Sequence, residues 1–226
     1  MSTMYFHMAD SWEEADAHFE SLMAVSSTRR VQLAQRVTAA GGPSLDRSVE
    51  SLVPLGEWYL HAVLDEAERD DAVDYRPEWF PAPSPRFRPR PDGPRAAPGW
   101  LLLLWEQVAI YVADVVMAEV TGSRWVCWRA RNPRDAYNGM PSVDVGVPVW
   151  PADVISLANA GVVAAWVSRA VPGSDRYQAH PTRMRDEVQK VLEDRSLYLA
   201  AHPPRWQAAP TGPKGARSLR VPAPQS

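Results

Sequence analysis

One stretch decides the fold: Trp100-Leu-Leu-Leu-Leu-Trp-Glu-Gln-Val-Ala-Ile-Tyr-Val-Ala-Asp-Val-Val-Met-Ala-Glu-Val120, followed by Thr121-Gly122-Ser123 and Arg124-Trp-Val-Cys-Trp-Arg-Ala130. Its first part is long enough for a helix and is apolar on nearly every side. Such a helix must be surrounded by protein, so the run predicts the core helix of a folded domain. Among its side chains, Trp105, Val108, Val112 and Val115 are expected to be buried together.

A membrane span is the alternative interpretation of this run. Its polar side chains argue against that alternative, because acidic residues are costly at the centre of a bilayer. On a helical wheel Glu106, Gln107 and Asp114 fall on one side, where we expect them to form a narrow wet stripe. A core helix that does not enter a membrane is therefore favoured.

Two short strands are expected after the core helix. Residues 124–130 alternate well enough for a strand, with Trp125 and Cys127 facing one way and Val126 and Trp128 the other. Residues 141–149 form the second strand, which its glycine and proline weaken. The two strands predict a small antiparallel sheet.

The remaining apolar periodicity predicts further helices. Ser11 and Glu14 form a capping box before a helix over 12–39, with a break at Ser26–Thr28 as an alternative. Gly41 and Gly42 are typical of a helix end. Three more helices are predicted from their start or stop signals. They run over 52–69, with Ser51 as N-cap, over 151–170, and over 183–201, with Thr182 as N-cap.

These elements predict one mainly helical α+β domain over residues 1–202, with about five helices and the small sheet. A proline-rich loop is expected over 75–99, because dense proline excludes helices and central strands. Residues 203–226 are rich in proline and arginine and show no apolar pattern, so a disordered tail is expected there.

Composition restricts the class of function. The chain of 226 residues has a net charge of −3 and a pI of about 6.0, which argues against nucleic-acid binding through bulk charge. The N-terminus lacks the basic and apolar regions of a secretory signal. With Cys127 as its single cysteine, the chain has no internal disulfide, and a cytoplasmic location is expected.

Candidate chemical residues have ordinary structural explanations. If Cys127 were a nucleophile, it would need a histidine partner. It lies in a predicted strand between tryptophans, and a free cysteine in such a place usually packs as a small apolar side chain. The candidate partners are His7, His18, His61, His180 and His202. Glu57, His61 and Asp65 share helical spacing that would suit a metal, but a solvated helix face explains them equally well. No cofactor is expected.

A binding surface has more support from the sequence. Acidic residues gather around the end of the second predicted helix, where they oppose the helix dipole, and such a run suits a basic protein partner. Trp79 and Phe80 follow it in the proline-rich loop, where they need a partner or a docking groove on their own domain. The predicted partner-binding residues are Asp65, Glu66, Glu68, Asp70, Asp71, Trp79 and Phe80.

The order of motifs resembles a family of uncharacterised, actinobacterial-type proteins with a helical α+β fold. The motifs are Leu45-Asp-Arg-Ser-Val-Glu-Ser-Leu52, written Leu-Asp-x-Ser-x-x-Ser-Leu, then Gly122-Ser-Arg-Trp125, Val143-Asp-Val145 and Val149-Trp-Pro151. The resemblance covers roughly residues 45–170. It implies similarity to small immunity or accessory proteins encoded near toxin or secretion genes.

Together these features favour a non-enzymatic protein that binds and holds a partner, either a toxin or an assembly component. One alternative is a structural or adaptor component of a larger bacterial assembly. The second is an enzyme whose site is assembled from distant residues, for which Glu106, Asp114 and Arg124 are the first candidates.

Overall fold

The computed structural model describes residues 11–66, 75–77, 98–130, 138–158 and 180–203. Its elements follow the order α1 (Trp12–Ala39), α2 (Leu52–Glu66), α3 (Gly99–Glu119), β1 (Arg124–Cys127), β2 (Pro141–Asp144) and α5 (Arg183–Ala201). A further helix begins at residue 154, and its continuation lies outside the described residues. The predicted class, mainly helical α+β with five helices and a two-stranded antiparallel sheet, is confirmed.

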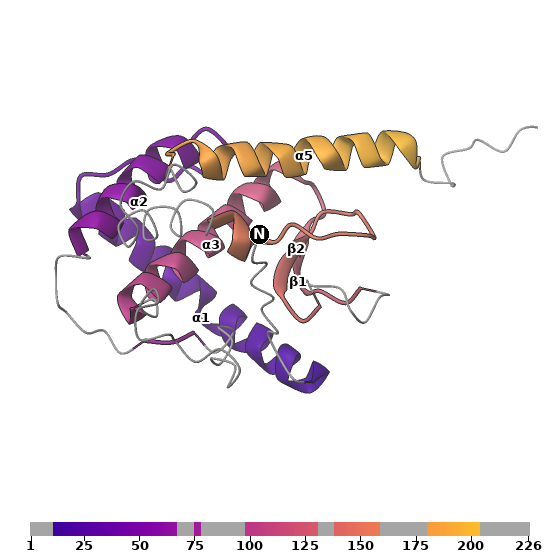
Figure 1. Ribbon diagram of the computed structural model, residues 1–226, viewed down its shortest axis with the longest axis horizontal. Helices are drawn as coiled ribbons and strands as arrows, with labels where there is room; N and C mark the ends of the chain where they lie inside the picture. Colours follow the sequence, from indigo (N-terminus) through magenta and orange to yellow (C-terminus); the bar gives the residue numbers. More distant parts are fainter. Residues whose placement is uncertain (1–10, 67–74, 78–97, 131–137, 159–179, 204–226) are drawn as a thin grey trace, which may run out of the picture.

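Helix α3 passes through the middle of the molecule (Figure 1) and packs against α1, α5 and β2. Almost every residue between Trp100 and Val116 is buried, including all four side chains expected in the core. In the described ranges α3 is the one helix long and apolar enough to cross a membrane, and 83% of its most apolar window is buried inside the protein. Protein atoms therefore surround this helix except near its C-terminal end.

Helix α1 has the predicted bounds and runs without the break considered at Ser26–Thr28. The Glu14 N–H donates to Ser11 Oγ at 3.1 Å, so the N-terminal cap is present. Ser26 does not interrupt the helix, and its hydroxyl donates to the Met23 carbonyl. At the other end Gly41 takes a φ of 65°, and the Gly42 N–H donates back to the Val37 carbonyl.

The segment 45–52 is a hydrogen-bonded connection into α2. Asp46 accepts from both the N–H and the hydroxyl of Ser48, and Ser48 Oγ accepts from the Ser51 N–H. The Ser51 hydroxyl lies 2.7 Å from the Tyr111 hydroxyl of α3. The Leu-Asp-x-Ser-x-x-Ser-Leu motif therefore fixes the start of α2 and ties it to the core helix.

The sheet is shorter than the sequence predicted. Arg124 pairs with Asp144 and Cys127 with Pro141 at the two ends of the register. Strand β2 ends at Asp144 instead of continuing to 149, because Gly146 turns with a φ of 78° and donates its N–H to the Asp144 carboxylate. The predicted strands over 124–130 and 141–149 were thus too long, although their antiparallel pairing is confirmed.

The helix after the sheet begins later than predicted. Asp153 caps it by accepting the Ser156 N–H at 3.1 Å, so the helix starts at residue 154 and not at Pro151. Ala152 is instead bridged to Val143 of β2. The indole N–H of Trp105 donates to the Ile155 carbonyl at 2.8 Å, which joins this helix to α3.

Helix α5 runs along one edge of the molecule, and its yellow C-terminal half extends beyond the sheet (Figure 1). Met184 and Val188 in its first half are buried. Farther along, Leu197 is 69% exposed. The predicted proline-rich loop lies largely outside the described residues, as does the tail after Pro203.

Removal of the tail after Pro203 is expected to leave the thermal midpoint unchanged. The reason is that the tail sequence offers few apolar side chains for packing. Thermal melts of the chain truncated after Pro203 and of the full chain measure this. A large drop in the midpoint would show instead that the tail packs on the domain.

Candidate functional site

Two ion pairs with buried carboxylates join α1 to α3, and we call this place the α1–α3 seam. Arg29 Nε lies 2.6 Å from a carboxylate oxygen of Glu106, whose side chain is 2% exposed. Arg30 binds Asp114 through two of its nitrogens, at 2.6 and 2.8 Å. The wet stripe expected at these acidic residues is therefore wrong, because arginines of α1 replace water as their partners.

Tyr75 completes the first ion pair, although it belongs to a short segment distant in sequence. Its hydroxyl donates to Glu106 at 2.7 Å and accepts from Arg29 Nη2 at 2.9 Å. The Arg29 guanidinium also lies 5.0 Å from the centre of the Tyr75 ring. Burial first, and then the hydrogen bond to Glu106, raise the pKa of Tyr75 to about 12.

A small cavity of about 180 Å³ opens beside this cluster, between Arg29, Tyr75 and Glu106 on one side and Ser21 and Val25 on the other. Burial alone would lower the pKa of Arg29, but its hydrogen bonds to Glu106 and Tyr75 raise it. The guanidinium is therefore held in its charged form against the carboxylate. This arrangement suits a structural clasp that keeps the segment 75–77 on the domain.

Stability is expected to fall between pH 10 and pH 12, with Tyr75 contributing to the fall. In that window the unfolded chain releases the phenolic proton while the folded protein keeps it, so rising pH favours unfolding. Tyr75→Phe removes this contribution. Thermal midpoints measured across the window should therefore decline less steeply in the variant than in the wild type, and identical slopes would contradict the proton assignment.

The residues considered for an assembled active site are not gathered in one place. Glu106 and Asp114 face α1 at separate points, about two helical turns apart. Arg124 is instead largely exposed, with its side chain 3.8 Å from Asp144 across the sheet. The structure thus pairs each of these groups with its own partner.

Most of the predicted partner-binding residues lie outside the described part of the chain. Asp65 and Glu66 belong to the last turn of α2, but their side chains lie outside the described part of the protein. The other five, which are Glu68, Asp70, Asp71, Trp79 and Phe80, fall in 67–74 and 78–97. This surface stays a prediction.

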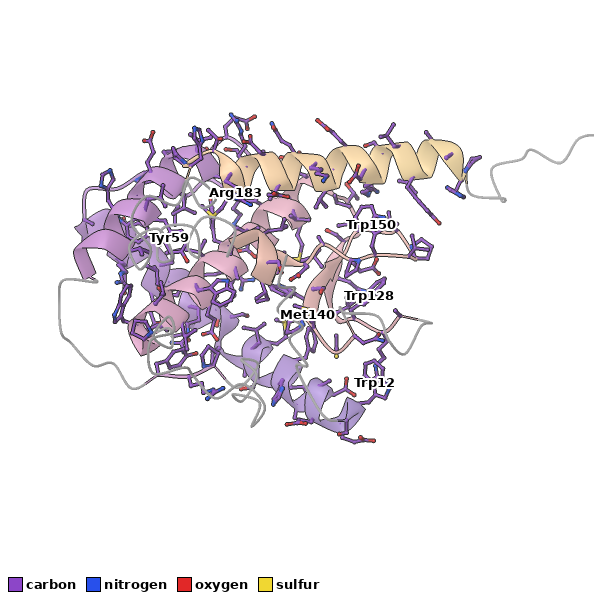
Figure 2. The ribbon with its side chains drawn as sticks, in the orientation of Figure 1. Trp12, Tyr59, Trp128, Met140, Trp150 and Arg183 are labelled. Atoms are coloured by element: carbon purple, nitrogen blue, oxygen red, sulfur yellow. The ribbon has the colours of Figure 1, made fainter. Side chains whose placement is uncertain are left out.

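Aromatic and apolar side chains remain partly exposed near the sheet, and we call this set the aromatic side. Trp12 is 40% exposed and Val149 is 59% exposed. Trp125, Trp128 and Trp150 are half-buried. Figure 2 shows Trp12, Trp128 and Trp150 on the side of the molecule that carries the sheet.

Trp12 is tied to the end of the first strand through Arg129. The Arg129 guanidinium lies 4.8 Å from the centre of the Trp12 ring and binds Asp16 of α1 at 2.5 Å. Because Arg129 directly follows Trp128, these contacts bring two tryptophans of the aromatic side into one region. The sequence places them far apart, and only the packing of α1 beside β1 joins them.

A groove of about 290 Å³ lies next to Trp150, between the start of the helix at residue 154 and α5. We call it the α5 groove. Residues from two distant stretches of the sequence line this groove. The apolar ones are Trp150, Leu157 and Val191, and the charged ones are Glu187, Lys190 and Asp194. A groove with an apolar base and charged edges is typical of a binding surface.

Cys127 lies at the end of β1 and is half-buried. Burial first, and then the negative charge of Asp16, raise the pKa of its thiol to about 11. A raised pKa keeps the sulfur protonated near neutral pH, which opposes a role as a nucleophile. Within the described ranges, no three His, Cys, Asp or Glu side chains gather closely enough to hold a metal ion.

No known protein family, curated protein or solved structure matches the chain. The resemblance carried by the 45–52 motif therefore stays an expectation.

Sequence reasoning missed the polar cluster between α1 and α3, because it did not single out Arg29, Arg30 or Tyr75. A signal was present: two acids inside an apolar helix require cations nearby, and Arg29-Arg30 is a pair of adjacent cations inside another predicted helix.

Proposed function

We propose that the protein acts by binding and holding another protein, as a cytoplasmic immunity-type or accessory factor that needs no cofactor. The aromatic side is the observation that carries this proposal. Tryptophan is enriched among the residues that dominate binding energy at protein interfaces. Trp12 and Val149 are exposed, and Trp128 and Trp150 stay half-buried, with Trp150 also packed against the core.

The acidic run supports the same proposal from a second place. Tyr75 is held at the α1–α3 seam, so it fixes the point from which the chain continues toward Trp79. In the sequence the acidic residues come directly before Tyr75, and Trp79 follows it by four positions. Such an arrangement suits a partner with a basic surface.

Affinity capture from the native host, followed by identification and reconstitution with the purified partner, tests the proposal. We expect one retained protein that forms a complex of fixed stoichiometry. A toxin as that partner supports the immunity role, and several components of one assembly would favour the adaptor alternative. Failure to reconstitute any complex would contradict the proposed function.

Charge reversal and aromatic truncation should have different kinetic effects on such a complex. Changing Asp70 and Asp71 to Lys is expected to slow association and to reduce its dependence on salt, because edge charges steer approach. Trp79→Ala is expected mainly to speed dissociation. Kinetic binding measurements at several salt concentrations separate the two effects, and unaltered rates in both variants would place the interface elsewhere.

A further inference from the structure

We infer that the α5 groove is a docking site for a basic segment of the partner protein, one with an apolar residue between Lys or Arg residues. This inference rests on the proposed protein-binding function and names the chemistry of the partner. The basis for it is that the segment 150–157 and residues 187–194 of α5 line one groove together.

The base of the groove suits an apolar anchor. Trp150 and Val191 are half-buried, and Leu157 is 8% exposed, so together they present an apolar surface that the described chain covers only in part. Filling this hollow with an apolar side chain would remove further apolar area from water. Burial of that kind favours the complex.

The charged residues around the groove indicate which charge a bound segment should carry. Glu187, Lys190 and Asp194 share one face of α5, since their spacing follows the helical repeat. Two carboxylates flank one ammonium group on this face. Negative charge therefore prevails at the edge, and Lys or Arg beside the apolar anchor complements it.

The dimensions favour a segment of a protein chain. From Glu187 to Asp194 the helix rises by about 10 Å, which corresponds to roughly three extended residues or two helical turns of a partner. A short amphipathic segment can then place one apolar side chain over Trp150 and its basic neighbours beside the carboxylates.

Selection from a random library of displayed 12-residue peptides, with the full-length protein immobilised, tests this inference. We expect enriched peptides in which Lys or Arg flank an apolar residue. A synthetic peptide of the enriched sequence should bind at least tenfold more weakly to the double variant Glu187→Lys with Asp194→Lys. Glu193→Lys is the matched control, because Glu193 is also exposed on α5 but does not line the groove.

Unchanged binding of the peptide to the double variant would overturn the inference, as would enrichment of acidic or uncharged peptides or no enrichment at all. Thermal melts confirm that the variants remain folded. The proposed function is separable from this result. If the captured partner still binds the double variant with full affinity, the α5 groove is not its site, while protein binding itself stands.

Discussion

Val112→Asp should abolish soluble folding. Val112 is fully buried near the middle of α3, surrounded by other apolar side chains of the core. A carboxylate at that position would lose its water without gaining a cation, and an unpaired buried charge costs more than the net stability of most domains. Expression yield in the soluble fraction and a thermal melt measure the effect.

Ala118→Asp is the matched control for this change. It introduces the same carboxylate on the same helix, but Ala118 is exposed near the C-terminal end of α3. That variant should fold, with a small loss because the helix C-terminus disfavours negative charge. If Val112→Asp instead melts within a few degrees of the wild type, the central position of α3 is wrong.

Glu106→Leu should destabilise the fold by about 3–5 kcal/mol, because it leaves the Arg29 guanidinium buried without its carboxylate. The side chain of Arg29 is only 15% exposed, so water cannot fully replace Glu106. Tyr75 also loses its acceptor. The double variant Glu106→Leu with Arg29→Met should recover much of the lost free energy of unfolding, since both charges are then replaced by apolar side chains.

An exposed ion pair provides the comparison for the buried one. Arg129 and Asp16 are also in contact, but both side chains are about half exposed. Removing Asp16 should therefore change the free energy of unfolding little. Denaturant unfolding of both sets of variants measures the change in the free energy of unfolding. Equal changes at the two ion pairs would contradict the structural importance of the α1–α3 seam.

The helices were predictable because local signals set their limits. Ser11 and the Gly41–Gly42 pair bracket α1, and the apolar content of α3 alone required burial on all sides. The strand ends were less predictable. Gly146 turns the chain immediately after β2, and a sequence pattern does not show whether a glycine ends a strand or only weakens it.

The candidate sites were harder to predict than the fold. Arg29 meets Glu106 only because α1 and α3 pack side by side, and the pairing spans 77 residues of sequence. The α5 groove likewise joins Trp150 to Val191, and neither residue lies in a recognisable motif of its own. Sequence patterns report local structure, whereas these sites arise from contacts between distant elements.

The central claim is that the protein binds a partner through its aromatic side, and one equilibrium measurement tests it most directly. The dissociation constant of the reconstituted complex should be compared between the wild type and Trp12→Ala with Trp150→Ala, after melts confirm folding. We predict binding at least tenfold weaker in the variant, equivalent to about 1.4 kcal/mol. An unchanged dissociation constant would contradict the claim.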